Sequence, residues 1–258
     1  MKEQSDNLEC EWKFVPPESP EVVLAHFREC LPRGWRLVKW PARSKLDIYF
    51  DTESGTLYGD GATFRFRKRQ RNKGWTANFK EPPLDGLPYH ARREIITRIT
   101  VEEALEHESG LVPGLAPTTA REYVERVSSP RPAPPLVPQL HVVSQRDGYT
   151  MRPGAIEDKE SNVVSVFLDD VTVVDVRDAA IRPLITSGFL DYTKPMRSFR
   201  LRNGEIEADG TAIGDQERAV AMLQELSARL QADGVEDQPA NKYQLGVRAL
   251  GLWHDGST

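Results

Sequence analysis

The sequence has few residues that can cross-link a chain and no long apolar run that could cross a membrane. Its 258 residues include two cysteines, Cys10 and Cys30, so a disulfide framework is not expected and a reducing cytoplasm fits best. No apolar run approaches the roughly 18 residues that span a bilayer. Residues 1–7 are polar and lack the apolar core of a signal peptide. We therefore expect a cytoplasmic protein without a membrane partner.

The sequence also lacks the common motifs of nucleotide-binding loops and of histidine- or cysteine-bound metals. It has neither a Walker A pattern nor a dinucleotide-binding glycine pattern, which argues against a P-loop mechanism. Its five histidines show no metal-ligand spacing, and its cysteines lack CxxC spacing. The net charge of −5 does not favour nonspecific binding to nucleic acid.

The charge that is present is distributed unevenly. Residues 61–98 contain ten Lys or Arg and three acidic residues, so this window is +7 and the remainder of the chain is −12. A basic stretch inside an acidic protein indicates a local anion site rather than a basic surface all round.

The first strand-like segment, residues 9–14 (ECEWKF), alternates charged and apolar residues. In a strand, Glu9, Glu11 and Lys13 share one face and the apolar residues share the other. Two carboxylates about 7 Å apart beside an ammonium make a poor packing surface. They make a good site for a divalent metal and a phosphate chain.

Later segments repeat this alternation of charged and apolar faces. The charged faces carry Arg65 and Arg67, Lys80 in phase with Asn78 and Thr76, Arg92 with Glu94, Asp169 with Phe167 and Ser165, and Glu205 with Glu207. One such face alone is most simply solvated. Taken together, with bulky apolar residues opposite, they predict a sheet closed into a barrel with the charges inside. Buried charges need a partner or a ligand, so we expect a polyanion with metal ions in the interior.

The remaining elements follow from turn and cap residues. Strands are expected at 46–51, 62–69, 74–80, 88–98, 140–146, 163–170 and 198–207, the last with a kink at 203–204. Turns are expected at 54–55 and 58–61, and helices at 20–31, 100–107, from 118 or 119, and at 215–231. A short helix or a loop is expected at 179–187, and partial helix in 241–253. The proline-rich segment 128–139 is interpreted as a surface connection within one domain spanning 1–258.

These residues resemble a known family. The segment from Glu9 to Lys13 resembles the ExExK signature of CYTH-domain proteins, the triphosphate tunnel metalloenzymes. Further matches follow in chain order: residues 47–52 (DIYFDT), 63–67 (TFRFR), 78–80 (NFK), 92–94 (RRE), Arg146, 167–169 (FLD), 205–207 (EIE) and 241–243 (NKY). The resemblance implies an α+β, mainly antiparallel fold, an eight-stranded closed β-barrel with helices packed outside and a core of about residues 8–245.

The resemblance also implies which residues form the site. The implied ligands of Mg²⁺ or Mn²⁺ are Glu9, Glu11, Asp169, Glu205 and Glu207. The implied substrate-binding residues are Lys13, Arg65, Arg67, Lys80, Arg92, Arg146 and Lys242. Glu9, Glu11 and Lys13 are the expected catalytic residues, with Lys13 either contacting a phosphate or neutralising the two glutamates. Asp169 is preferred over Asp170, and Glu94 is expected to pair with Arg92. The long link 170–202 leaves the register of Glu205 and Glu207 open.

The implied activity is metal-dependent hydrolysis of the terminal phosphate of inorganic, thiamine or nucleoside triphosphate. Such phosphoryl transfer needs positioning and charge neutralisation more than covalent help. The alternatives are a class IV-like adenylyl cyclase, a triphosphate- or polyphosphate-binding module without turnover, and an RNA 5′-triphosphatase. The expected partner is a small triphosphate-containing molecule, and the expected state is a monomer or homodimer.

Overall fold

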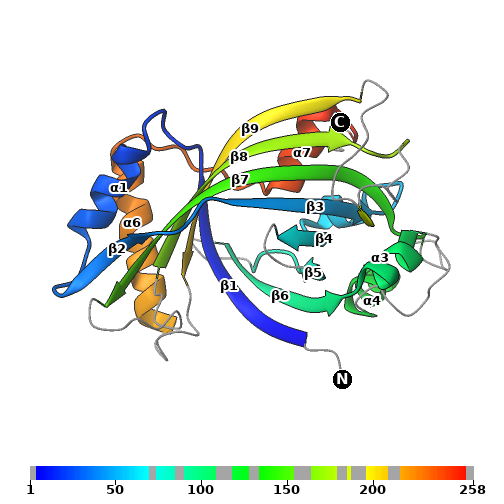
Figure 1. The fold of residues 1–258 in the computed structure, drawn as a ribbon, viewed down its shortest axis with the longest axis horizontal. Coiled ribbons are helices and arrows are strands. Elements are labelled where there is room, and N and C mark those ends of the chain that lie inside the picture. Colours follow the sequence, from blue (N-terminus) through cyan, green and yellow to red (C-terminus); the bar gives the residue numbers. More distant parts are fainter. Residues whose placement is uncertain are drawn as a thin grey trace.

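The computed structural model describes residues 4–69, 74–84, 90–108, 118–127, 134–153, 164–178, 185–186, 196–208 and 216–253. Figure 1 shows a barrel of long, curved strands with helices at its two ends. Among the helices of these ranges, none is long and apolar enough to cross a membrane.

Eight antiparallel strands form the barrel. They are β1 (Gln4–Phe14), β3 (Arg43–Asp51), β4 (Thr63–Arg69), β5 (Trp75–Lys80), β6 (His90–Ile99), β7 (Val137–Pro153), β8 (Val164–Asp175) and β9 (Ser198–Ala208). Their order is β7-β3-β4-β5-β6-β1-β9-β8, and β8 pairs again with β7. This last pairing closes the sheet and confirms the eight-stranded closed barrel.

The outer face of the barrel is apolar and is covered by helices. One cluster of buried side chains, including Phe64, Phe66 and Phe79, packs beneath α2 (Thr56–Asp60), α3 (Val101–Glu108) and α4 (Thr118–Val127). A second, including Trp12 and Phe14, packs beneath α1 (Pro20–Glu29) and α6 (Gln216–Ala232). The apolar half of each alternating strand therefore supplies the core, which leaves the charged half for the interior.

The last helix lies against the inner face of the sheet. Tyr243 and Val247 of α7 (Lys242–Leu250) are fully buried against Tyr49, Leu140 and Val142 of β3 and β7. Asn241 caps the start of α7 in a capping box with Gln244. Because Val142 is opposite Asp47 in the sheet, this contact is on the charged side. The helix thus occupies one end of the barrel interior.

Several strands and turns differ from the sequence-based expectation. β7 and β8 extend well beyond 140–146 and 163–170 because they pair with each other along twelve residue positions. Residues 56–60 form the short helix α2, so the turn expected at 58–61 is wrong for most of its length. An additional strand, β2 (Trp35–Lys39), was not expected and pairs with the far end of β7.

The kink expected at Asn203 and Gly204 is also wrong. β9 pairs with β8 without a register shift through both residues. Gly204 is required for a different reason, because a Cβ atom there would lie 2.4 Å from the Phe14 ring. Some predictions fall wholly or partly outside the described residues. They are the proline-rich connection 128–139, the short helix or loop at 179–187, the link 170–202 and the helix start expected at Asp215.

Candidate active site

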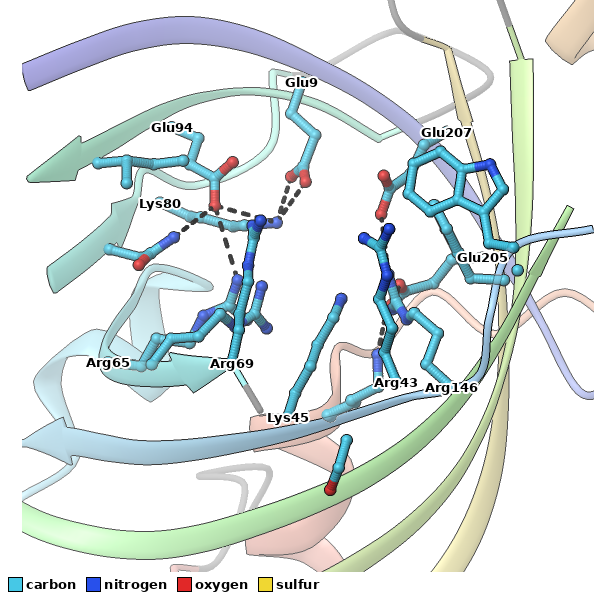
Figure 2. A pocket seen from close by; sticks show the side chains of 18 of the residues that line it. Glu9, Arg43, Lys45, Arg65, Arg69, Lys80, Glu94, Arg146, Glu205 and Glu207 are labelled. Atoms are coloured by element: carbon cyan, nitrogen blue, oxygen red, sulfur yellow. Dashed lines mark hydrogen bonds and ion pairs between the residues drawn. The ribbon is translucent and has the colours of Figure 1, made fainter. Parts of the chain in front are cut away.

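The barrel encloses a cavity of about 460 Å³ whose wall is mostly charged. Eight Lys or Arg residues and four glutamates line it among the described residues: Arg43, Lys45, Arg65, Arg67, Arg69, Lys80, Arg146, Lys242, Glu9, Glu94, Glu205 and Glu207. Figure 2 shows many of these side chains converging on the cavity from several strands. A surplus of four positive charges in a protein of net charge −5 favours a polyanionic ligand.

Strand alternation places these charges inside, as the sequence predicts. On β4, Arg65 and Arg67 face the interior while Phe64 and Phe66 are buried in the outer core. Successive side chains of a strand point to opposite faces, so one pattern supplies both layers.

Three carboxylates from β1 and β9 come together on one wall. Glu9, Glu11 and Glu207 each offer an oxygen, and these oxygens lie within 4.8 Å of one another. Glu11 is directly opposite Glu207 in the sheet, which explains the approach. Burial raises the pKa of Glu207 to about 7, and Glu205 and Glu9 add to the effect. Such closely spaced hard oxygens fit a divalent cation, and we call this group the acidic wall.

Four cations of the described residues contact the acidic wall, and one of them is Arg146, which lies 3.7 Å from Glu207. Lys80 contacts the Glu9 carboxylate, Arg92 contacts Glu9 and Glu11, and the Lys13 ammonium lies 2.5 Å from Glu11. Although burial alone would raise the pKa of Glu11, Lys13 and Arg92 bring it well below its usual value. Burial lowers the pKa of Lys13 to about 8. Lys13 is thus a partner of Glu11 and is not among the residues that line the cavity.

A second ionic cluster joins β7, β8, β9 and α7. Arg146 donates two hydrogen bonds to Asp169, at 2.7 and 2.6 Å, and contacts Glu205. Lys242, the first residue of α7, lies 2.9 Å from Asp169 and also contacts Glu205. Asp169 is buried, whereas Asp170 is exposed. Asp169 is therefore the inward carboxylate, and its oxygens are engaged by Arg146 and Lys242.

A third cluster holds the arginines of β4. Arg67 donates from Nε and Nη2 to the two oxygens of Asp47, both at 2.7 Å. Arg65 lies 3.7 Å from Asp47 and donates to the Tyr49 hydroxyl at 3.0 Å. Asp47 is not among the site residues predicted from the sequence. The signal for its inward position was available, because Asp47 and Tyr49 share one face of the strand and the apolar Ile48 lies on the other face.

Glu94 has different partners from the one expected. Its carboxylate lies 3.6 Å from Arg65 and 3.7 Å from Lys80, and it accepts a hydrogen bond from Asn78 at 3.3 Å. Lys80 and Asn78 come from β5, the neighbour of β6, and Arg65 comes from β4 beyond it, rather than from the same strand as Glu94. Glu94 lines the cavity and links the β4 arginines to Lys80.

Three further cations at the cavity are not among the site residues predicted from the sequence. Lys45 and Arg43 precede the strand start expected at residue 46, and Arg69 is the last residue of the strand expected at 62–69, next to the hairpin tip. All three line the cavity. The Arg43 guanidinium lies 4.4 Å from the centre of the Trp40 ring, which also lines it. Residues 70–73 of the hairpin tip lie outside the described part of the chain.

No protein-family model and no curated protein matches the sequence. Solved structures do match. HpAC1 from Hippeastrum, described as a candidate adenylyl cyclase with a dominant triphosphatase activity, has a TM-score of 0.52 at 17% identity, over 95% of this chain and 99% of that one. A candidate adenylate cyclase from Bacillus halodurans has a TM-score of 0.53 at 17% identity, over 93% and 97%. The chain shares their fold. At this identity the likeness extends to the fold alone.

Proposed function

We propose that this protein is a divalent-metal-dependent hydrolase that cleaves the terminal phosphate of a triphosphate inside the barrel. The observation that carries the proposal is the charge of one cavity wall. Glu9 and Glu207 line the cavity opposite a wall rich in Lys and Arg, and the buried Glu11 lies behind them with its oxygen within 4.8 Å of theirs. A pure anion site has no need of clustered carboxylates, and a pure metal site has no need of eight cations. The triphosphatase activity described for HpAC1, which has the same fold, supports this reading.

The acidic wall is the proposed metal site. Glu9, Glu11 and Glu207 would hold Mg²⁺ or Mn²⁺, since both ions prefer carboxylate oxygens. A bound ion supplies Lewis-acid polarisation of phosphate oxygens and a more acidic water. The family resemblance also implies Asp169 and Glu205 as ligands. Neither belongs to the group of carboxylates whose oxygens lie within 4.8 Å of one another, and Arg146 and Lys242 engage both, so we propose that these two acids position the cations instead.

The cavity-lining cations are the proposed phosphate ligands, namely Arg65, Arg67, Lys80, Arg146 and Lys242. The pair with Asp47 fixes the Arg67 guanidinium through Nε and Nη2 and leaves Nη1 outside the pair. A guanidinium held in this way loses little entropy on binding an oxygen. Prepositioned charge of this kind suits phosphoryl transfer, in which neutralisation and alignment dominate.

Lys13 and Arg92 have a supporting part in this proposal. Both contact Glu11, and neither lines the cavity. Together they keep Glu11 ionised, and an ionised carboxylate is what a metal ligand requires. We propose that they position the acidic wall rather than bind phosphate.

A second candidate is an adenylyl cyclase, which would release pyrophosphate from a nucleoside triphosphate. The observation in its favour is the apolar part of the cavity wall, where Trp40, Pro41 and Ile96 could contact an organic head group. The same surface would serve a hydrolase acting on a nucleoside or thiamine triphosphate. The products separate the two reactions.

The test is to incubate the protein with Mg²⁺ or Mn²⁺ and inorganic triphosphate, thiamine triphosphate or ATP, and to follow products by ³¹P NMR. We expect orthophosphate and the corresponding diphosphate. Pyrophosphate together with a cyclic nucleotide would show that the reaction is cyclisation instead of hydrolysis. Tight binding without turnover of any substrate would overturn the enzyme proposal.

A further inference from the structure

Lys45 on β3 is a buried cation without a carboxylate partner among the described residues. Four lysines are buried in this part of the chain. Lys13 contacts Glu11, Lys80 contacts Glu9, and Lys242 contacts Asp169. Among the described residues, no carboxylate lies within 4.0 Å of the fourth, Lys45, although its side chain is about as buried as theirs.

Most of the charged groups nearest to Lys45 are cationic. Figure 2 shows its side chain pointing into the cavity, with Arg65 and Arg69 on one side and Arg43 and Arg146 on the other. Its ammonium lies 5.8 Å from the centre of the Phe167 ring, too far for a strong contact. Burial, with Arg146 and Arg67 adding and with Asp169 and Glu207 opposing, lowers the pKa of Lys45 well below its usual value.

An ammonium in this position destabilises the empty protein. A buried charge costs free energy unless a partner or ligand neutralises it, and neighbouring like charges add to the cost. The strand does not require a lysine there, because an uncharged side chain of similar length would fill the same space. The arrangement therefore makes physical sense with an anion in the cavity.

We propose that Lys45 binds a phosphate group of the cavity's ligand directly, from the wall that faces the acidic wall. Figure 2 shows Glu9 and Glu207 across the cavity from Lys45. A triphosphate between the two walls would meet Lys45 on one side and the carboxylate-bound metal on the other. This inference rests on the proposed function, and it adds a substrate-binding residue that the ionic clusters do not include.

The test compares Lys45→Met with the wild type, using inorganic triphosphate as the probe and EDTA to remove metal. Thermal unfolding measures the stability of the empty protein, and titration calorimetry measures affinity. We expect the melting temperature of the empty variant to stay the same or rise, because an unpaired charge is lost. We expect affinity for triphosphate to fall about ten- to a hundredfold, as for loss of a charged hydrogen bond. Lys45→Arg should keep part of the affinity.

Two lysines provide matched controls. Lys242→Met should lower the melting temperature of the empty protein, because Asp169 and Glu205 lose a partner. Lys39→Met should change neither stability nor affinity, because Lys39 is exposed and lies outside the cavity. The opposite effects of Lys45→Met and Lys242→Met on the empty protein are the distinctive signature.

The outcomes separate this inference from the proposed function. Wild-type affinity in Lys45→Met overturns the inference and leaves the proposed function standing. A loss of stability like that of Lys242→Met, or failure of both Lys45→Met and Lys45→Gln to fold, also overturns it, because it means that Lys45 has a structural partner. A wild type that binds no triphosphate, with or without Mg²⁺, overturns the proposed function itself.

Discussion

At the scale of single residues, the charges inside the barrel act as clusters in which each side chain fixes another. Arg146 illustrates this, because its guanidinium is held by Asp169 and Glu205 at the same time. Removing one member of such a buried cluster leaves the others unpaired. Substitutions in the interior should therefore affect stability and binding to different degrees, depending on what each side chain contacts.

Asp169→Asn should separate a positioning carboxylate from a metal ligand. We expect the free energy of unfolding to fall by about 3–5 kcal/mol, because Arg146 and Lys242 lose a charged acceptor. Affinity for Mn²⁺, measured by electron paramagnetic resonance, should be unchanged. In Glu9→Gln/Glu11→Gln it should fall by about tenfold or more. An equal loss of Mn²⁺ affinity in Asp169→Asn would return Asp169 to the metal site.

Asp51 should make the free energy of unfolding depend on pH, independently of the charged residues of the cavity. It is fully buried and accepts hydrogen bonds from the backbone N–H groups of Thr52, Leu57 and Tyr58 and from the Tyr243 hydroxyl. Burial raises its pKa from 3.8 to about 6. Between pH 3.8 and about 6, the Asp51 carboxyl is protonated in the folded protein and ionised in the unfolded protein. The contribution of this proton to stability is therefore largest below about pH 4 and is lost as the pH rises through 6.

The prediction is a change in relative stability between the wild type and Asp51→Asn. In urea unfolding from pH 4 to 7, the wild type should lose up to about 3 kcal/mol relative to the variant. The other carboxylates titrate equally in both proteins, so the difference isolates Asp51. Parallel curves across this range would show that the pKa of Asp51 is not raised.

At the scale of elements, the pairing of β1 with β9 brings together the residues of the acidic wall. Phe14 and Gly204 are directly opposite in this pairing, and the Phe14 ring occupies the space that a Cβ atom at position 204 would need. Glu11 and Glu207 are paired a few residues further along the same two strands. The apolar contact on the outer face therefore supports the position of the carboxylates on the inner face.

Gly204→Ala should destabilise the protein through this contact. A Cβ atom 2.4 Å from the Phe14 ring forces β1 and β9 apart, which should cost about 1–3 kcal/mol in urea unfolding. Gly59→Ala in α2 is the matched control. Its Cβ would meet no atom within 4 Å, so it should leave stability unchanged or raise it by up to about 1 kcal/mol. Equal stability of the two variants would contradict this packing.

Alternating residues predicted most of the strands but not their partners. Residues 9–14 and 63–67 show charged and apolar faces clearly, because one side packs against helices and the other faces the cavity. Lys45 was missed because β3 begins before its apolar residues do. The pairs Arg67–Asp47 and Lys242–Asp169 join segments far apart in sequence, and local periodicity carries no information about such contacts.

At the scale of the whole molecule, the protein is acidic overall and has a basic interior. The cavity wall carries four more positive than negative side chains, whereas the chain carries a net charge of −5. Helix α7 occupies one end of the barrel interior and places Lys242 among the charged residues. This separation of charge concentrates attraction for a polyanion in the cavity, next to the carboxylates that would hold a metal.

The most direct test of the central claim is the rate of orthophosphate release from inorganic triphosphate, measured with Mg²⁺ or Mn²⁺ and again in EDTA. We expect release by the wild type only when metal is present, and a rate about a hundredfold or more lower in Glu9→Gln/Glu11→Gln. Equal release with and without metal, or full activity in the double variant, would contradict it.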